Sequence, residues 1–447
     1  MIAAYRPAAA RERVDAFHVV ADSGSYDAVA KIRGDDYRID VTIDGFAYAF
    51  GRHDGIRWRR TPSGTVRTIA SDVQGDPLDR WPDAVVGFEP SNCRAAGETA
   101  TEWVLACKPA RDALHYLYVD PRAGTIAREA VREGAKIVRY AFHGASFAIE
   151  GFGGTANVAA TETARPVSSD DVAVPASTSA IFALPAAGVA RVPALFGRWI
   201  RIPVTIDGHA STFVFDSGTT QMLIDARAAR SFGLTTRFGH TIASAVNVGD
   251  AVGRDVPMQV VDLFGGQASG LLGNEFFTGH IVHIDYRGSG KIELLDRTSF
   301  VPPPGASPLA AGFGEGLPIV AGSVDGVAGS RFALDTGSNL ILVTDAFAAA
   351  AGVRARSATS QERFLEGPVS NSRTSLRRLQ FGAAVFDHPD AAVEVPDREN
   401  LDIPLDAIVG SDALAHFEWW FDYDGGLIWM RPIRHAGPTT TSSSCSR

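Results

Sequence analysis

The chain has 447 residues and a formal net charge of −9 at pH 7, and 45% of its residues are hydrophobic. This length predicts about two to four folded units. Because no basic run is present, a nucleic-acid partner is not expected, and no stretch approaches the roughly 18 apolar residues of a membrane-spanning helix. Residues 1–17 contain no apolar core of signal-peptide length, so we expect either a cytoplasmic protein or a trimmed, exported form.

Residues 1–161 are predicted to form an antiparallel β domain. In YRIDVTID (37–44), apolar and polar side chains alternate with the period of a half-buried strand, and runs such as HYLYVD and KIVRYAFHG are separated by turn sequences. This strand and turn pattern resembles the curved sheets of bacterial lipoprotein-carrier proteins, but no motif assigns the domain a role. Cys93 and Cys107 flank one turn, and a disulfide and two free thiols are equally compatible with that spacing.

Residues 162–180 are rich in Ser, Pro, Thr and Ala, which predicts a linker. Short strands separated by Gly and Pro follow up to residue 433, and the Thr/Ser-rich tail 434–447 is expected to be disordered.

The region 181–433 contains an internal repeat. PVTIDGHASTFVFDSGTTQMLID, from Pro203, aligns with AGSVDGVAGSRFALDTGSNLILVTD, from Ala321. Each copy has a strand, an Asp-Gly turn, a second strand, and then the pattern Asp-Ser/Thr-Gly-Thr/Ser. We therefore divide the region into units 181–300 and 301–433.

Matching landmarks follow each copy. The apolar segments that end at Leu272-Gly273 and Val409-Gly410 are each followed, 12 residues after the glycine (285 − 273 and 422 − 410), by an Asp-Tyr pair. A Gly-containing turn and an apolar run come next, which is typical of a hairpin.

The paired motifs Asp216-Ser217-Gly218-Thr219 and Asp335-Thr336-Gly337-Ser338, each followed by an apolar-apolar-Gly segment, resemble those of the pepsin/retropepsin-type aspartic proteases. The closest resemblance is to bacterial single-chain forms with two fused retropepsin-like halves, and it covers residues 181–433. It implies an all-β fold in which a two-lobed β-barrel protease, with lobes 181–300 and 301–433, follows a separate antiparallel β domain.

The chemistry of this family requires two carboxylates, and Asp216 and Asp335 are the predicted catalytic pair. Two carboxylates about 3 Å apart cannot both ionise, so one keeps a proton, as in aspartic proteases generally. The ionised carboxylate can activate a water while the protonated one polarises the peptide carbonyl. No metal, cofactor or covalent intermediate is required.

The other motif residues are expected to support the pair. By resemblance, the Ser217 and Thr336 hydroxyls bond across between the two loops, and the Thr219 and Ser338 hydroxyls bond to the outer carboxylate oxygens. The glycine in each motif permits a tight turn and brings amide groups near the carboxylates.

Other patterns are weaker. Asp22-Ser23-Gly24-Ser25 also fits the motif but lacks both landmarks, so it is interpreted as an ordinary turn. His280 and His283 would point to opposite faces of a strand, which argues against a shared metal. The non-catalytic alternative for the two motifs is a structural repeat whose aspartates lie in turns.

The family's flap, the hairpin that closes over the substrate, is not marked by its usual tyrosine. No tyrosine lies between Ser217 and Asp285 or between Thr336 and Asp422. Flap candidates are therefore placed by position alone, at about residues 235–250 and 357–376.

The resemblance implies an aspartic endopeptidase that acts on a peptide or protein substrate, bound as an added strand. Because both motifs lie in one chain, a monomer is expected, and the bacterial relatives suggest the periplasm or cell envelope, with the cytoplasm as the alternative. Two other functions stay open: a peptide-binding protein that does not cut, or a latent protease whose cleft is blocked by a flap or by the N-terminal domain. That domain could also serve targeting or carry a lipid or peptide.

Overall fold

The computed structural model describes residues 12–433 except for 22–23, 35, 44–45, 70–92, 108–113, 134–135, 144–145, 152–153, 178–180, 220, 238, 264–267, 288–289, 314–315, 355–358, 365–366 and 395–404. Strands account for 60% and helices for 7% of the structure, so the predicted all-β class is confirmed. The predicted disordered tail, 434–447, lies outside the described residues. No helix in the described part of the chain is both long and apolar enough to cross a membrane.

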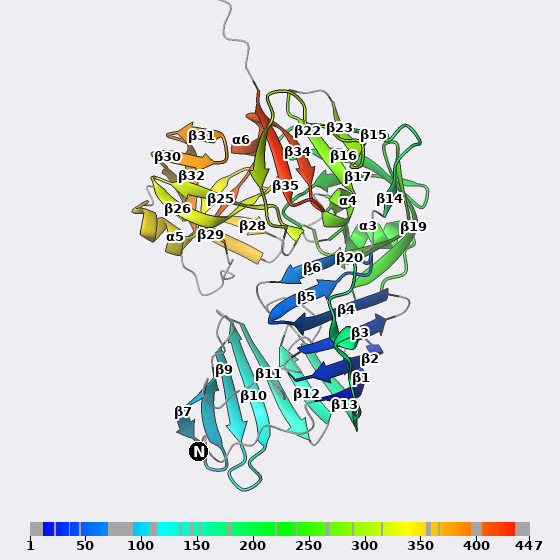
Figure 1. The fold of residues 1–447 in the computed structure, drawn as a ribbon, viewed down its shortest axis with the longest axis vertical. Coiled ribbons are helices and arrows are strands. Elements are labelled where there is room, and N and C mark those ends of the chain that lie inside the picture. The colour runs from blue at the N-terminus through cyan, green and yellow to red at the C-terminus, as the bar shows by residue number, and fades with distance from the viewer. Residues whose placement is uncertain are drawn as a thin grey trace, which may run out of the picture.

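The N-terminal domain is one antiparallel sheet, which curves through the lower part of Figure 1. Its described strands follow the order β6-β5-β4-β3-β2-β1-β13-β12-β11-β10-β9-β8-β7, so the chain runs outward to one edge and returns from the other edge to lie beside β1. The strands are β1 (Glu12–Ala21), β2 (Gly24–Arg33), β3 (Asp36–Ile43), β4 (Phe46–His53), β5 (Ile56–Arg60), β6 (Val66–Ile69), β7 (Cys93–Glu98), β8 (Trp103–Cys107), β9 (Leu114–Val119), β10 (Ile126–Glu133), β11 (Lys136–His143), β12 (Ser146–Gly151) and β13 (Gly154–Ala164).

Buried and exposed side chains alternate along the strands of this sheet, so one face of the sheet is apolar and packed. Along β3, Tyr37, Ile39, Val41 and Ile43 are buried while the residues between them are more exposed, as the sequence pattern predicts. At the far edge, Cys93 and Cys107 face each other on β7 and β8 and form a disulfide, which decides between the two alternatives left open by their spacing.

Part of the predicted linker packs against this sheet. Strand β13 extends to Ala164, and the short helix α2 (Ser169–Val172) contacts β2, β3 and β4. Val172 is fully buried, and Lys31 Nζ lies 3.1 Å from Asp171 Oδ1. The described residues of this segment are therefore attached to the N-terminal sheet rather than extended in solvent.

The remaining described strands form three sheets (Figure 1). The first sheet has the order β14-β20-β18-β21-β17-β16-β19, and the helix α3 contacts β18 and β20. Its elements are β14 (Phe182–Ala183), β16 (Arg201–Ile206), β17 (His209–Phe215), β18 (Leu223–Asp225), α3 (Ala226–Ser231), β19 (His240–Val248), β20 (Ala251–Val261) and β21 (Gly270–Leu272).

The second of these sheets repeats the same arrangement later in the chain. Its order is β28-β29-β32-β27-β33-β26-β25-β30-β31. Its elements, with the two helices nearby, are β25 (Ile319–Val324), β26 (Val327–Leu334), β27 (Ile341–Val343), α5 (Asp345–Ala351), β28 (Thr359–Phe364), β29 (Gly367–Ser375), β30 (Arg378–Phe381), β31 (Ala384–Asp387), β32 (Asp390–Glu394), β33 (Ala407–Val409) and α6 (Ser411–Leu414).

The third sheet combines strands from both copies of the repeat. Its order is β15-β23-β22-β34-β35-β24, with β22 antiparallel to β34 at the centre. Its elements, with the helix that leads into it, are β15 (Val189–Pro193), α4 (Asn274–Phe277), β22 (His280–Asp285), β23 (Lys291–Asp296), β24 (Ser307–Ala310), β34 (Phe417–Asp422) and β35 (Leu427–Pro432).

The Asp-Gly turns form as the repeat predicts. They join β16 to β17 and β25 to β26, and both residues of each turn have positive φ angles: 47° and 87° at Asp207-Gly208, 53° and 90° at Asp325-Gly326. Positive φ at both central positions is the geometry of a two-residue hairpin turn. Each aspartate also accepts two backbone N–H bonds from a neighbouring strand or turn.

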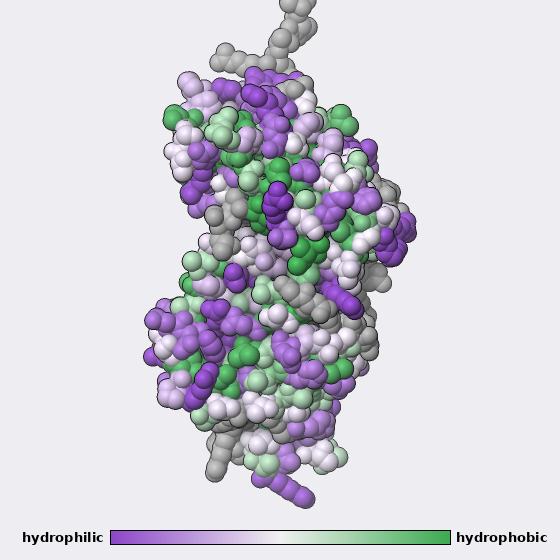
Figure 2. Space-filling model, turned by 90° about the vertical axis from the view of Figure 1, so that its right-hand side faces the viewer, coloured by the Kyte–Doolittle hydropathy of each residue, from purple (hydrophilic) through white to green (hydrophobic). Residues whose placement is uncertain are grey.

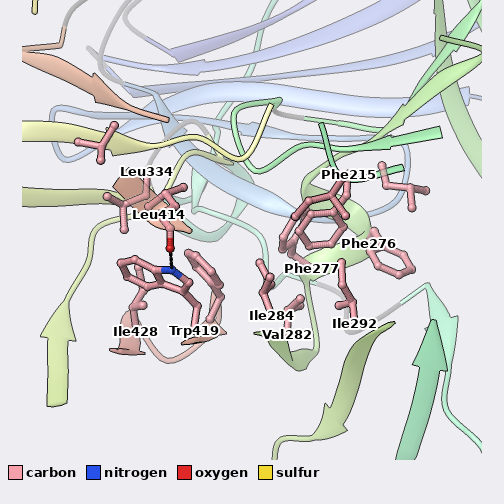
Figure 3. Close-up of a cluster of buried hydrophobic side chains, with 14 of the residues drawn as sticks. Phe215, Phe276, Phe277, Val282, Ile284, Ile292, Leu334, Leu414, Trp419 and Ile428 are labelled. Atoms are coloured by element: carbon pink, nitrogen blue, oxygen red, sulfur yellow. Dashed lines mark hydrogen bonds between the residues drawn. The ribbon is translucent and has the colours of Figure 1, made fainter. Parts of the chain in front are cut away.

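One hydrophobic core spans the three sheets of this region (Figure 3). Phe215, Phe276 and Phe277 pack on one side of the view and Trp419 on the other. The Trp419 indole N–H donates to the Leu414 carbonyl at 2.8 Å, so its buried polar atom is satisfied.

Candidate active site

Asp216 and Asp335 each directly follow a buried strand. Asp216 follows β17, which runs parallel to β21, and its N–H donates to the Leu272 carbonyl at 3.1 Å. Asp335 follows β26, which runs parallel to β33, and its N–H donates to the Val409 carbonyl at 3.0 Å. The apolar-apolar-Gly segments therefore hold the backbone of both aspartates in the same way.

Two buried hydroxyls lock the motif loops together. The Ser217 hydroxyl donates to the Leu334 carbonyl at 2.8 Å and accepts the Thr336 N–H at 3.0 Å. The Thr336 hydroxyl donates to the Phe215 carbonyl and accepts the Ser217 N–H, both at 3.0 Å. Since four bonds cross between residues 117 to 121 apart in sequence, the relative position of the loops is rigidly set.

The two carboxyl groups face each other across the glycines of the opposite motif. A Cβ atom on Gly218 would lie 2.5 Å from Asp335 Cγ, and one on Gly337 would lie 2.5 Å from Asp216 Oδ1. No side chain fits at such distances, so only glycine allows this approach. Each glycine N–H also donates to the carboxylate of its own motif, Gly218 to Asp216 and Gly337 to Asp335, both at 2.8 Å.

The surroundings of the pair shift the pKa of Asp335. Burial raises the pKa of Asp335, whereas the Gly337 amide, the Asp216 carboxyl and the Ser338 amide lower it in part. The net effect on the Asp335 pKa is upward. A pair with one proton can supply both an acid and a base at mildly acidic pH.

Two of the supporting residues bond differently from the expectation. The Thr219 hydroxyl donates to the Gln221 carbonyl at 3.4 Å, and the Ser338 hydroxyl accepts the Leu340 N–H at 3.3 Å. Ser338 does reach Asp335, but through its backbone N–H at 3.2 Å. The expected hydroxyl bonds to the outer carboxylate oxygens are therefore replaced by bonds to the backbone within each loop.

The glycines that end the apolar segments are needed for close packing. A Cβ atom on Gly273 would collide with the Gln221 carbonyl, and one on Gly410 with the Leu340 carbonyl. The two carbonyl residues, Gln221 and Leu340, are equivalent in the repeat, because each lies five residues after its motif aspartate (221 − 216 and 340 − 335). These glycines thus bring the segments against the ends of the motif loops.

Tyr286, the tyrosine of the first Asp-Tyr landmark, has a buried hydroxyl that is affected by the charge of Asp335. Its hydroxyl is buried next to the Ser411 hydroxyl, and Ser411 Oγ donates to the Thr336 carbonyl at 3.3 Å. Burial raises the pKa of Tyr286. The negative charge of Asp335 raises this pKa further, whereas the neighbouring Ser411 hydroxyl lowers it. The Asp-Tyr landmark was the only signal that pointed to this residue.

The histidines of HIVH have other partners. His280 Nε2 lies 2.8 Å from the Phe182 carbonyl, while His283 lies between the carboxylates of Glu293 and Glu418, at 3.0 and 2.9 Å. Elsewhere in the described chain, Asp36, His53 and Asp54 bring three possible metal-ligand atoms within 4.8 Å of one another. That group lies on the N-terminal sheet, away from the motif loops.

The flap candidates differ in structure. In the segment 235–250, Arg237 and His240 exchange two backbone hydrogen bonds just before β19. In the segment 357–376, β28 and β29 form an antiparallel hairpin, with Phe364 opposite Gly367 at its end.

Comparison with known proteins agrees with this geometry. Residues 320–413 match the family model described as aspartyl protease. The match includes Asp335 and Gly410 and supports an aspartic-protease family for the chain. The all-β architecture with barrel-like sheets is compatible with an aspartic-protease β fold. No curated protein matches the chain.

Proposed function

We propose that the chain is an aspartic endopeptidase with two retropepsin-like lobes, 181–300 and 301–433, and one active site between them. The observation that carries this proposal is the reciprocal approach of the motif loops, in which each carboxyl group lies against the glycine of the other motif. Asp216 and Asp335 are the proposed catalytic residues. The family match and the equivalent strand pairings of the two copies support the same conclusion.

The proposed reaction uses a pair of carboxyl groups that holds one proton. The ionised carboxylate accepts a proton from a water held between the two groups as the water oxygen attacks the peptide carbonyl carbon. The protonated carboxyl donates a hydrogen bond and then its proton to the carbonyl oxygen. As the tetrahedral intermediate collapses and the C–N bond breaks, the carboxyl that took the water's proton gives it to the departing nitrogen, and the other carboxylate recovers its proton from the hydroxyl formed on the carbonyl oxygen. The substrate would bind in an extended form, as an added strand.

Cleavage assays test the proposal directly. The wild type should cleave an unstructured protein such as casein between about pH 3 and pH 7, and Asp216→Asn and Asp335→Asn should each abolish cleavage. Pepstatin should inhibit the wild type. An inert wild type, or full activity in either single variant, would contradict the proposal.

A second candidate is a protein that binds peptides without cutting them. It is favoured by the bonding of the Thr219 and Ser338 hydroxyls to the backbone instead of to the carboxylates. This candidate predicts that casein peptides bind equally well to the wild type and to Asp216→Asn, with no cleavage by either.

We also propose a monomer that resides in the periplasm or cell envelope. One chain provides both motifs, so catalysis needs no second copy. The disulfide between Cys93 and Cys107 supports an oxidising compartment. Cell fractionation and sedimentation of the purified protein test these two statements.

A further inference from the structure

Glu275 is a buried carboxylate that touches the first motif loop. It lies in α4, two residues after Gly273, and only 3% of its surface is exposed. Its Oε2 accepts the N–H of Met222 at 2.7 Å, between the motif that begins at Asp216 and strand β18. A hydrogen bond from an amide to a buried carboxylate is strong, so Glu275 fixes the end of this loop.

The second oxygen of Glu275 faces the N-terminal sheet. Oε1 accepts a hydrogen bond from the Ser63 hydroxyl at 3.4 Å, across 212 residues of sequence. Ser63 lies in the turn of residues 61–65, which joins β5 to β6. Figure 1 shows these two strands at the edge of the sheet nearest the rest of the chain. One side chain thus connects the N-terminal sheet to the first motif loop.

The turn of residues 61–65 is itself well braced. The Thr61 N–H donates to the Thr65 carbonyl at 2.9 Å, and the Gly64 N–H donates to the Thr61 carbonyl at 2.8 Å. Thr61 and Thr65 are buried, and Ser63 also contacts both of their hydroxyls. A turn held in this way presents the Ser63 hydroxyl in a defined position.

A ring contact also joins the sheet to the first copy of the repeat. The buried ring of Phe46 lies 5.5 Å from the His240 ring, at the start of β19 and within the first flap candidate. Within the N-terminal part, the Val66 N–H donates to the hydroxyl of Ser177 in the segment 162–180 at 3.1 Å, which holds this segment against the same sheet. In Figure 2 the outline narrows between the upper and lower parts of the molecule.

The repeat offers an internal comparison. Asp412 lies two residues after Gly410, as Glu275 lies two residues after Gly273, but the Asp412 side chain is shorter and exposed. A buried acid at this position is therefore not required by the repeat itself. The two positions differ in that the N-terminal sheet contacts Glu275 through Ser63.

We propose that Ser63 and Glu275 form an intramolecular docking contact that positions the first motif loop for hydrolysis. The N-terminal sheet is then a working part of the enzyme and not a removable inhibitor. Glu275 is a positioning residue, since it acts on Asp216 through the Met222 amide. The statement about hydrolysis rests on the proposed endopeptidase function, whereas the coupling between the sheet and the loop does not.

Four substitutions in the full-length chain test the contact. We expect Glu275→Ala to lower kcat about tenfold and Ser63→Ala about threefold, with KM unchanged, because one or two hydrogen bonds that orient Asp216 are lost. Glu275→Gln should recover part of the rate, since its amide oxygen can still accept the Met222 N–H. Asp412→Ala is the matched control and should stay within about twofold of the wild type.

Amide hydrogen exchange over residues 216–222 gives a second readout that needs no activity. Exchange there should be faster in Ser63→Ala than in the wild type or in Asp412→Ala, at equal melting temperature. Unchanged kcat and unchanged exchange in Ser63→Ala would overturn the inference, and so would a rise in kcat, which an inhibitory sheet predicts. If the wild type is inert, the proposed endopeptidase function fails, and the exchange data alone decide whether the sheet is coupled to the loop.

Discussion

Replacing Gly337 by alanine probes the approach of the two motif loops. A Cβ atom at this position would lie 2.5 Å from Asp216 Oδ1 and 2.6 Å from Oδ2, whereas real Cβ contacts are essentially never shorter than 3.0 Å. The Asp216 carboxyl must therefore retreat by at least 0.5 Å (3.0 − 2.5). Since a misplacement of about 1 Å costs roughly 100-fold in rate, we expect kcat to fall about tenfold to 100-fold.

The assay is the initial rate of casein cleavage at the optimal pH, with melting temperatures measured in parallel. Gly218→Ala should show a similar loss, because its Cβ would meet the Asp335 carboxyl. Gly312→Ala is the control, since no atom lies within 4 Å of the position its Cβ would take. A folded Gly337→Ala protein with wild-type kcat would refute the geometric reasoning.

Three further predictions concern pH and stability. Burial raises the pKa of Asp335, so the folded protein holds this proton more tightly than the unfolded chain; stability and cleavage should both decline as pH rises through the raised pKa. Melting temperatures measured at acidic and neutral pH check this prediction, and the melting temperature of Asp335→Asn should depend less on pH than that of the wild type. An equal change of melting temperature with pH in both proteins would contradict the prediction. Cys93→Ser opens a loop closed across a sequence separation of 14 and should cost the N-terminal sheet about 3 kcal/mol, measured by urea unfolding and matched by reduction of the wild type. Glu418 is buried, accepts hydrogen bonds from Arg287 and Arg431, and faces His283. Glu418→Ala should therefore lower the free energy of unfolding by about 3 kcal/mol, and Glu418→Gln should lower it by less. Equal free energies of unfolding in the wild type and both variants would show that this network does not stabilise the protein.

The strands and the two Asp-Gly turns were largely predictable because they depend on local patterns. Alternation of apolar residues marked strands such as β3, and the Asp-Gly pairs marked two hairpin turns whose positive φ angles the structure reproduces. The approach of Asp216 to Asp335 followed from two matched motifs, each at the end of a buried strand. Repetition carried this information, since a single motif such as Asp22-Ser23-Gly24-Ser25 gave no such expectation.

Contacts between distant segments were not predictable. The bonding of Thr219 and Ser338 depends on small differences in loop geometry that leave no trace in residue type. Glu275 looks like an ordinary helical acid until the turn around Ser63 is seen beside it. The packing of α2 on the N-terminal sheet was likewise hidden, because its composition is that of a linker.

The pairing of β22 with β34 has an evolutionary consequence. A symmetric homodimer must change both of its halves with every substitution, because one gene encodes both. Here the two sides of the central sheet belong to one chain, so each motif loop can acquire mutations independently of the other. Glu275 and Asp412 differ in this way: the same position holds a buried acid that contacts the N-terminal sheet in one copy and an exposed acid in the other.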